Sequence, residues 1–457
     1  MYKKVYLVSP SLSPFSEKLK AQTPPVGLGY IASMLDTNNI EYQVCDMNLG
    51  YPLPWLIKQI NYFKPDLVAF TTHSLLQHKV IYSLINKISG CGFDTVIGGP
   101  LVSSLGTNVL KESNVTYAIK YEGEYAILEL CKGNQPKDIK NLIYRENGNI
   151  IENEDRPRIK SLDEIPFPRY KKFELEKYLD KRIHILSSRG CPNNCSFCQF
   201  KVLSGNEFRP RGLENVLEEI KYWYAKGYRE IEFCDDNLNI DKNRIYKLCE
   251  LIKKNNLKNL ELIAGYVSVN NLDKDLLALM KSSGFKKLSL GVESGSDKVL
   301  KTIGKPQTVL QIKKAIKESC KIGLAVNLDM TIGHPKEKVT DVFKSILLSL
   351  TYPIANAYFW NLIPLPNTKL YNWVKRNNYF VIPIEKYANF DIKKINETPV
   401  FETSEFKAGQ RKIMLLLSHK VTGYIKIKNK CRLFLRKLFL DMRICLLPRY
   451  KLNIFLS

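Results

Sequence analysis

The sequence predicts an α/β protein in two parts: a doubly wound, Rossmann-like parallel sheet, then a partial (β/α)6 TIM-like barrel with a helical C-terminal tail. Residues 1–132 alternate apolar runs with helical periodicity, residues 139–180 are polar and contain prolines, and the alternation resumes at residue 183. Strands that alternate with helices at this spacing are typical of parallel sheets. The domains expected from these patterns are 1–138, 139–180, 181–370 and 371–457.

Short apolar runs mark the strands expected in the first part. They lie at 5–8, 42–45, 67–71, 95–97 and 116–119, with helical patterns at 28–36, 55–63, 80–88 and 124–132. Residues 142–145 and 150–152 flank Asn147-Gly148, a pair typical of a β-hairpin turn. The hairpin and the linker that follows make up the expected segment 139–180. A ligand of the first sheet is expected beyond the carboxyl ends of its strands.

Six further apolar runs predict the strands of the barrel. They lie at 184–187, 230–234, 261–264, 287–291, 326–332 and 357–363, with helical patterns between them, such as 213–225 and 310–322. Active sites of such barrels lie at the C-terminal ends of the strands. Motifs that follow these runs are therefore candidate catalytic or cofactor-binding segments.

Composition limits the function classes. The chain has 457 residues with 69 basic and 45 acidic side chains, a net charge of +24, and 11 cysteines. That cysteine content is too low for a disulfide scaffold, and no signal-peptide cleavage site follows the N-terminus, so we expect a reducing, cytoplasmic location. Residues 346–366 carry no charge but include three prolines, which favours a helix end, a loop and a strand over a membrane span.

The tail concentrates the positive charge. Residues 407–457 hold 13 Lys or Arg and one acidic residue, Asp441. Apolar residues from Cys431 to Leu446 recur at helical spacing, which predicts an amphipathic basic helix. Two roles are open: docking on the barrel, which we favour, and contact with an anionic membrane surface. The charge also permits nucleic acid, but the chain has no aromatic-interleaved RNA motif.

Three cysteines form the sharpest chemical signal. Cys191, Cys195 and Cys198 lie within eight residues, directly after an expected strand. Three thiolates can hold three irons of a cubane cluster and leave the fourth iron open to a ligand. Zinc is the alternative, but such zinc sites normally take a fourth ligand from a second Cys or His pair, and the sequence has no second CxxC or HxxxH pair.

The CxxxCxxC spacing, with Phe197 before the third cysteine, resembles that of the radical S-adenosylmethionine (SAM) enzymes. Residues 233–237, 291–295, 331–335 and 364–368 resemble strand-end motifs of that family, in the expected order, with Asn367 where glycine is usual. The resemblance implies a [4Fe–4S] cluster whose open iron binds SAM and cleaves it reductively to a 5′-deoxyadenosyl radical. The SAM contacts that it implies are Phe197, Asp235, Asp236, Glu293, Ser294 and Gly333. For the two aspartates the alternative is N-capping of the next helix.

The first part resembles the cobalamin-binding domain fused to many radical SAM enzymes. The resemblance rests on residues 24–30, 65–72, 96–100 and 121–124 and on the linker 162–168. Glycine and hydroxyl residues at strand ends let a flat or phosphate-bearing cofactor approach the backbone. The cobalamin contacts implied are Pro25, Gly27, Leu28, Gly29, Thr71, Thr72, Gly98, Gly99, Glu122, Gly123 and Glu124.

One departure concerns the cobalt ligand. Many cobalamin domains carry Asp-x-His-x-x-Gly after the first strand, but residues 9–15 contain no histidine here. His73 and His78 are the only histidines of the first part, and surface or helix-start roles are expected for both. The resemblance therefore leaves cobalt without a protein imidazole.

Eight cysteines remain outside the motif, and most are expected to act as small hydrophobic residues. Cys45, Cys91 and Cys131 can alternatively hold a second cluster, as in the tRNA methylthiotransferases of the radical SAM family. Against this, Cys45 ends a later strand than that family's first cysteine, and the tail is helical instead of a small β-barrel.

Together the resemblances imply a cobalamin-dependent radical SAM methyltransferase that acts on an unactivated carbon of a small-molecule or natural-product substrate. The implied partners are that substrate and a reductant such as flavodoxin or ferredoxin. The alternatives are a radical SAM enzyme of cyclisation or rearrangement, a tRNA methylthiotransferase-like enzyme, and a non-catalytic corrinoid- or cluster-binding protein.

Overall fold

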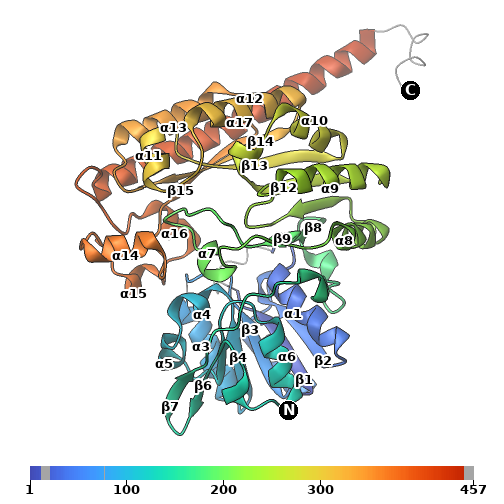
Figure 1. Ribbon diagram of the computed structural model, residues 1–457, viewed down its shortest axis with the longest axis vertical. Coiled ribbons are helices and arrows are strands. Elements are labelled where there is room, and N and C mark those ends of the chain that lie inside the picture. The colour runs from blue at the N-terminus through green and yellow to red at the C-terminus, as the bar shows by residue number, and fades with distance from the viewer. Residues whose placement is uncertain (12–20, 77, 447–457) are drawn as a thin grey trace.

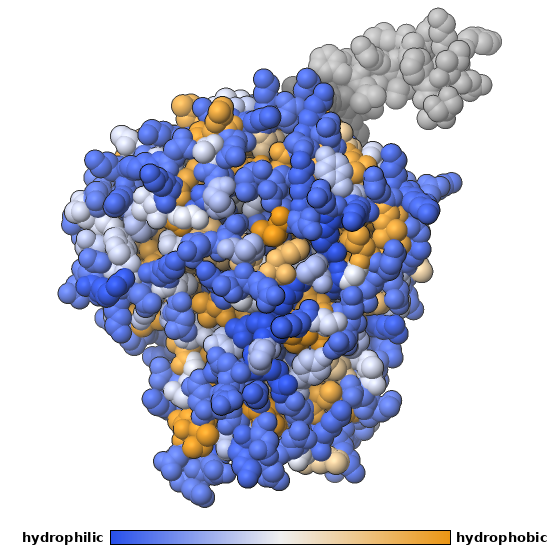
Figure 2. All heavy atoms as spheres, viewed as in Figure 1, coloured by the Kyte–Doolittle hydropathy of each residue, from blue (hydrophilic) through white to orange (hydrophobic). Residues whose placement is uncertain are grey.

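The computed structural model describes residues 1–11, 21–76 and 78–446, and the side chains as far as Cys431. Two α/β units lie one above the other (Figure 1), with the N-terminal sheet below, the barrel sheet above, and the short helix α7 (Phe200–Leu203) between them. The face shown in Figure 2 is mostly hydrophilic, with apolar side chains scattered in small groups. The predicted α/β class, with a Rossmann-like sheet and a partial barrel, is confirmed.

The N-terminal unit is a seven-stranded sheet in the order β2-β1-β3-β4-β5-β6-β7. Its first five strands are parallel: β1 (Lys4–Ser9), β2 (Glu41–Asp46), β3 (Leu67–Thr71), β4 (Asp94–Gly98) and β5 (Tyr117–Ile119). The predicted hairpin, β6 (Leu142–Glu146) and β7 (Asn149–Glu152), pairs antiparallel with β5 and so extends this sheet. The pairing covers the edge that β5 would otherwise expose.

Helices cover both faces of this sheet because its strands are apolar on both sides. Val5 and Leu7 belong to one buried cluster, whereas Tyr6 and Val8 belong to another. Successive strand residues point to opposite faces, so the two clusters are the two faces. The helices are α1 (Val26–Thr37), α2 (Leu53–Phe63), α3 (His78–Ser89), α4 (Pro100–Leu105), α5 (Asn108–Glu112) and α6 (Glu124–Lys132). The short helices α4 and α5 had no sequence prediction.

The linker packs the two units together through an aromatic residue. Tyr170 lies so close to α1 that a Cβ at Gly29 would be 2.4 Å from its ring. The same ring lies 5.6 Å, centroid to centroid, from Trp223 of α8 (Leu213–Ala225) in the barrel unit. One buried apolar cluster therefore runs from the N-terminal sheet to the barrel.

The barrel unit is a six-stranded parallel sheet in the order β15-β14-β13-β12-β11-β8. Its strands are β8 (Arg182–Ile185), β11 (Glu230–Phe233), β12 (Glu261–Val267), β13 (Phe285–Glu293), β14 (Ala325–Ile332) and β15 (Asn356–Asn361). Its principal outer helices are α8, α9 (Lys242–Lys254), α10 (Lys274–Ser282), α11 (Asp297–Thr302), α12 (Val309–Ile322) and α13 (Val339–Thr351). All six predicted strands are present, and β8 does not pair with β15, so the barrel stays open.

The helix α17 (Ala408–Leu446) packs along the open edge of β15. The Thr422 hydroxyl donates to the Ala357 carbonyl at 2.7 Å, and the Asn429 amide donates to the carbonyls of Ile354 and Ala355 at 2.9 Å. These side chains occupy carbonyls that an edge strand leaves unpaired. Docking of the tail on the barrel is therefore confirmed as far as Asn429. The side chains of the predicted apolar stripe after Cys431 lie outside the description, as do residues 447–457.

Among the described residues, no helix is long and apolar enough to cross a membrane. The uncharged segment 346–366 contains the end of α13, a turn and β15, as predicted.

Candidate cofactor site

The three-cysteine loop begins at a position that only glycine can occupy. Gly190 has φ +85°, and a Cβ there would be 2.0 Å from the Glu207 carbonyl oxygen. Its N–H donates to Asp236 Oδ2 at 2.7 Å, which ties the loop to the carboxyl end of β11. The loop is therefore held at the C-terminal ends of the barrel strands, where the sequence predicts it.

The far side of the loop is fixed by two other elements. The Ser196 N–H donates to the carbonyl of Ile303, at the end of α11, at 2.9 Å, and the Leu370 N–H of α14 (Lys369–Arg376) donates to Ser196 O at 2.8 Å. Gly304 has φ +72°, and a Cβ there would be 2.9 Å from the Asn194 carbonyl. Backbone hydrogen bonds on both sides therefore fix the position of the loop that carries the thiols.

Cys191, Cys195 and Cys198 are each partly buried. Burial raises the pKa of all three, that of Cys198 to about 12. Three thiolates on one loop can hold three irons of a cubane cluster and leave the fourth iron open to a ligand.

A largely buried ion pair lies beside the cluster loop. Lys305 Nζ donates to Glu293 Oε1 at 3.1 Å, and the Thr331 hydroxyl donates to Glu293 Oε2 at 2.8 Å. Burial would lower the pKa of Lys305, but Glu293 and the neighbouring Cys195 outweigh it and raise that pKa, so the amine stays charged. Sequence reasoning missed Lys305, because nothing in its local sequence distinguishes it from other lysines.

Glu293 itself has a strained backbone. It ends β13 with φ +64°, which is uncommon for a residue that carries a side chain. Such strain is concentrated at functional sites. This backbone conformation places the Glu293 carboxylate at the ends of β13 and β14. We interpret the carboxylate as part of the site.

Several buried polar atoms at this end of the barrel lack a partner. They are Ser196 Oγ, Asn237 Oδ1, Ser294 Oγ and both ring nitrogens of His334. Buried polar groups are normally hydrogen-bonded, so orphaned ones that gather at a strand end indicate a ligand. This donor and acceptor set fits the amino, carboxylate and ribose groups of SAM.

The predicted SAM residue Phe197 packs against His334. The two ring centroids are 5.3 Å apart, and burial lowers the pKa of His334 to about 4, so its imidazole is neutral. Phe197 thus joins the cluster loop to the end of β14.

The two predicted aspartates have different surroundings. Asp235 is fully buried and accepts hydrogen bonds from the Ser187 N–H and from the hydroxyls of Ser187 and Ser188. Asp236 instead lines a cavity. Neither caps the next helix, since Asp241 is the N-cap of α9, so the capping alternative is wrong. A cofactor contact for either aspartate stays a prediction.

Gly333 is required for packing against the tail. It has φ +113°, and a Cβ there would be 1.7 Å from Nη2 of Arg411, a fully buried residue of α17. The Gly333 N–H donates to Glu337 Oε2 at 2.6 Å. Arg411 therefore accounts for the glycine, and a SAM contact at Gly333 stays a prediction.

A cavity of about 250 Å³ separates the N-terminal sheet from the cluster loop. Eight predicted cobalamin residues line it: Gly27, Leu28, Thr71, Gly98, Gly99, Glu122, Gly123 and Glu124. The barrel unit contributes Leu186, Ser188, Arg189, Leu203, Ser204 and Asp236. A Cβ at Gly27 would meet no atom within 4 Å, so the backbone there faces open space. The enclosed volume fits part of a cobalamin.

Three other residues predicted to contact cobalamin are not among the lining residues. Gly29 packs on Tyr170, and the Thr72 hydroxyl donates to the Gly98 carbonyl at 2.9 Å. Pro25 is the N-cap of α1. In this structure all three support the walls of the cavity, and a cofactor contact for them stays a prediction.

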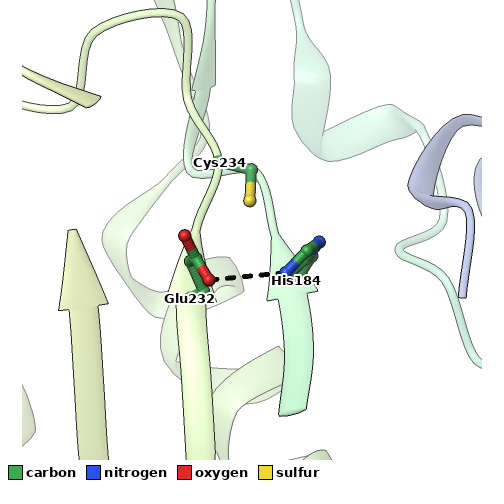
Figure 3. A group of neighbouring side chains, drawn as sticks. All are labelled: His184, Glu232 and Cys234. Carbon is green, nitrogen blue, oxygen red and sulfur yellow. Dashed lines mark ion pairs between the residues drawn. The ribbon is translucent and has the colours of Figure 1, made fainter. Parts of the chain in front are cut away.

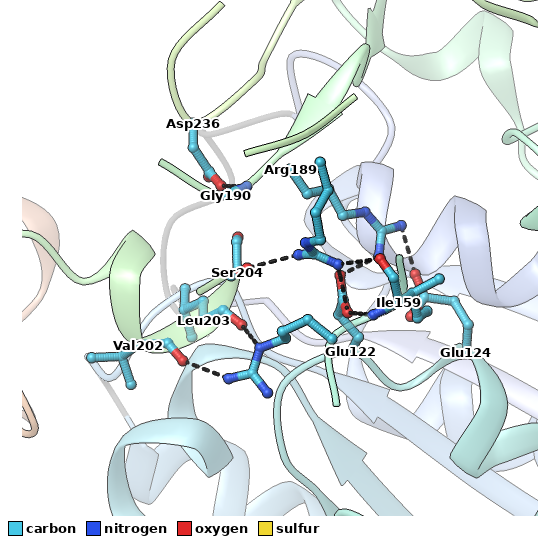
Figure 4. A network of polar contacts seen from close by, with 11 residues as sticks. Glu122, Glu124, Ile159, Arg189, Gly190, Val202, Leu203, Ser204 and Asp236 are labelled. Atoms are coloured by element: carbon cyan, nitrogen blue, oxygen red, sulfur yellow. Dashed lines mark hydrogen bonds and ion pairs between the residues drawn. The ribbon is translucent and has the colours of Figure 1, made fainter. Parts of the chain in front are cut away.

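An ion-pair network crosses between the units at this cavity (Figure 4). Arg189 pairs with Glu122 at 3.1 Å and with Glu124 at 2.7 Å, and Arg209 also pairs with Glu122, at 2.9 Å. Arg189 directly precedes Gly190 of the cluster loop. The network therefore ties the predicted cobalamin carboxylates to the start of the cluster loop.

The structure separates the cysteines of the possible second cluster. Cys45 and Cys131 belong to the buried clusters on opposite faces of the N-terminal sheet, and Cys91 is exposed. His73 is exposed and His78 begins α3, as expected, although the His78 side chain is buried. The loop predicted to lack a cobalt ligand lies largely outside the described residues.

These elements define a two-cofactor enzyme, with a thiol loop on a partial barrel and a ligand cavity on a parallel sheet. Residues 185–348 match the family model for the radical SAM superfamily, and residues 13–131 match that for the B12 binding domain. The chain is 30% identical over 441 residues to the uncharacterized methyltransferase PH0819 of Pyrococcus horikoshii, with 93% of each chain covered. The chain belongs to the radical SAM superfamily and carries an N-terminal B12-binding domain.

Two further comparisons agree. The cytidylyl-2-hydroxyethylphosphonate methyltransferase of Streptomyces wedmorensis is 25% identical, with 73% of each chain covered. The structure of the radical SAM methyltransferase TsrM from Kitasatospora setae, with cobalamin and a [4Fe–4S] cluster bound, has the same fold. Its TM-score is 0.72 at 18% identity, over 84% of this chain and 79% of that one. The protein is an enzyme whose cofactors are a [4Fe–4S] cluster, SAM and cobalamin.

Proposed function

We propose that the protein transfers a methyl group to an unactivated carbon of a small-molecule or natural-product substrate. The observation that carries the proposal is the Arg189 network, which brings the cobalamin cavity against the first residues of the cluster loop. Methyl transfer to carbon needs both cofactors within reach of one substrate, and this arrangement supplies that proximity.

The bound cofactors would supply the chemistry: the cluster reduces and cleaves SAM to a radical that removes hydrogen, and cobalamin carries the methyl group. The chain's own residues position and enclose them. In this proposal Cys191, Cys195 and Cys198 hold the cluster. Lys305 faces the SAM carboxylate, and Asp236 faces its amino or ribose groups.

Substrate recognition would fall to the interior face of the open barrel. Residues of β13 and β14 alternate, so that Leu288, Leu290, Val326 and Leu328 pack on the outer helices. The intervening residues lie on the other face, and they are polar: Lys287, Ser289, Asn327 and Asp329. The barrel-mouth loops and residues 370–406 would add to this face in setting specificity. A polar lining favours a substrate with hydrogen-bonding groups.

Partners follow from the same chemistry. Reduction of the cluster requires an electron donor, for which flavodoxin or ferredoxin is proposed. A cytoplasmic location stays a prediction from the cysteine content. Peripheral membrane contact through the basic tail also stays a proposal, and it concerns the part of α17 beyond Asn429, since the earlier turns pack on β15.

The products of SAM test the reaction class. The reconstituted protein, with cobalamin and a strong reductant, is incubated with SAM and candidate substrates, and the SAM products are quantified. A radical methyltransferase yields S-adenosylhomocysteine and 5′-deoxyadenosine together with a methylated product. A cyclisation or rearrangement enzyme yields 5′-deoxyadenosine alone. Neither product would appear with a non-catalytic binding protein.

A further inference from the structure

A second group of metal-ligating side chains lies on the barrel, apart from the cluster cysteines. His184 of β8 and Glu232 of β11 are directly opposite each other in the strand register, and Cys234 follows two residues after Glu232. One ligand atom from each lies within 4.8 Å of the other two. Figure 3 shows the Cys234 thiol directed toward the space between the imidazole and the carboxylate.

These side chains lie on the interior face of the open barrel. Ile183, Ile185, Ile231 and Phe233 alternate with His184 and Glu232 and belong to the buried cluster under the outer helices. Because strand residues alternate between faces, His184 and Glu232 face the other way, into the barrel. The side chains of both are about one fifth exposed, so an ion can reach them.

Neighbouring groups orient two of the three ligands. Thr23 Oγ1 lies 3.3 Å from His184 Nδ1, and this contact leaves Nε2 to face Glu232 at 3.5 Å. Arg182 donates to Glu232 Oε2 at 2.8 Å. Ligating histidines in proteins almost always have the second ring nitrogen held in this way, and ligating carboxylates are themselves hydrogen-bonded.

A glycine on the next strand leaves room for the carboxylate. Gly265 of β12 adjoins Glu232, and a Cβ at Gly265 would be 3.2 Å from Glu232 Oε1 and 2.7 Å from the Phe233 carbonyl. The second carboxylate oxygen, which Arg182 does not bind, thus lies in the space that the glycine leaves.

We propose that His184, Glu232 and Cys234 bind a divalent transition-metal ion, with Zn²⁺ the preferred one. A nitrogen, an oxygen and a sulfur ligand make a set that zinc accepts, and three protein ligands leave a fourth position open. Zinc bonds of about 2.0 to 2.3 Å place ligand atoms roughly 3.3 to 3.8 Å apart. Side-chain rotations that move the ligand atoms by about 1 Å would therefore bring them to zinc-binding distances. An ion pair alone would account for His184 and Glu232, but it leaves the converging thiol unexplained.

The open position would face the barrel interior, and Cys234 lies two residues before Asp236 in the sequence. A metal there can bind a carboxylate, phosphonate or other oxygen donor of a substrate. The metal site itself does not depend on methyl transfer, because zinc binding can be measured without turnover.

The test uses the full-length protein with its iron–sulfur cluster reconstituted, dialysed against Zn²⁺ and freed of loosely bound metal. Zinc and iron are counted per chain by mass spectrometry. The wild-type protein should retain about one zinc besides about four irons. The variants His184→Gln and Cys234→Ser should bind zinc at least tenfold more weakly and keep their iron. Cys249→Ser, which changes a buried thiol on the outer helix α9, should keep both metals.

Zinc K-edge X-ray absorption adds a readout of the ligands. One sulfur at about 2.3 Å with nitrogen and oxygen neighbours at about 2.0 Å is expected, and the sulfur should disappear in Cys234→Ser. Should one variant fail to fold, Glu232→Gln takes its place. The proposal is overturned if the wild-type protein retains no zinc, or if all variants retain it equally.

Discussion

At the scale of the residue, Lys305 and Glu293 form a largely buried ion pair between the cluster cysteines and the ends of β13 and β14. A charged amine in this position can meet the carboxylate of SAM, because charge-assisted hydrogen bonds are strong where water is excluded. We therefore propose that Lys305 positions SAM and provides no ligand to the cluster.

We predict that Lys305→Met weakens SAM binding by about ten- to a hundredfold, since it removes a charge-assisted contact worth about 1.5 to 3 kcal/mol. Equilibrium dialysis with labelled SAM measures the change, and the iron content should stay near wild type. Lys301→Met, on the neighbouring helix α11, is the matched control and should bind SAM normally. An unaltered affinity in the Lys305 variant would refute the assignment.

Asp329 gives a prediction that depends on pH. Burial raises its pKa to about 6, although the Trp360 indole N–H donates to it at 3.4 Å. The folded state thus holds this proton more tightly than the unfolded chain. The contribution to stability is present below about pH 4 and is lost as the pH rises through 6. Asp329→Asn should therefore gain between about 1 and 3 kcal/mol over wild type between pH 4 and pH 7.5.

Thermal melts of the two proteins across that pH range measure the gain. If the melting difference between Asp329→Asn and wild type does not change with pH, the raised pKa of Asp329 is wrong.

At the scale of the element, α17 covers the free edge of β15 on the open side of the barrel. We predict that the double variant Thr422→Val/Asn429→Leu, which removes three side-chain bonds to β15 or the residues before it, destabilises that edge by about 2 kcal/mol. Hydrogen exchange of residues 354–361 should accelerate by about tenfold or more. Lys420→Ala, on the same helix, should leave the exchange unchanged, and equal rates in all three proteins would contradict the role of α17.

The strands were predictable from sequence, whereas two short helices and a long-range packing contact were not. Apolar runs such as 67–71 and 230–234 are local signals, and each is a strand at nearly those bounds. The helices α4 and α5 escaped prediction because five or six residues carry too little periodicity. The packing of Arg411 on Gly333 joins residues 78 positions apart, and no local pattern reports such a contact.

The candidate site shows the same contrast between local motifs, which were predictable, and contacts between distant residues, which were not. The cysteine spacing and the glycine-rich strand ends are local signals, and eight of the residues singled out from the strand ends line the cavity. The partners of Glu122 and Glu124 are Arg189 and Arg209, which come from the other unit. An ion pair between residues so far apart in the sequence produces no pattern within either segment.

At the scale of the whole molecule, the Arg189 network joins the two cofactor domains. We predict that Arg189→Gln destabilises the protein by about 3 kcal/mol, because it leaves the buried carboxylate of Glu124 without its ion-pair partner. The triple variant Arg189→Gln/Glu122→Gln/Glu124→Gln should recover part of that loss, since it removes the stranded charges. Thermal unfolding of the three proteins compares them, and a loss in the triple variant larger than in the single one would argue against this account.

The central claim is that one chain holds a [4Fe–4S] cluster and a cobalamin side by side. Its most direct test is anaerobic reconstitution with iron, sulfide and hydroxocobalamin, followed by counts of iron and corrin per chain. The account predicts about four irons and one corrin, with the iron lost and the corrin kept in Cys198→Ala. Zinc in place of iron at the three cysteines, or four irons with no retained corrin, would contradict it.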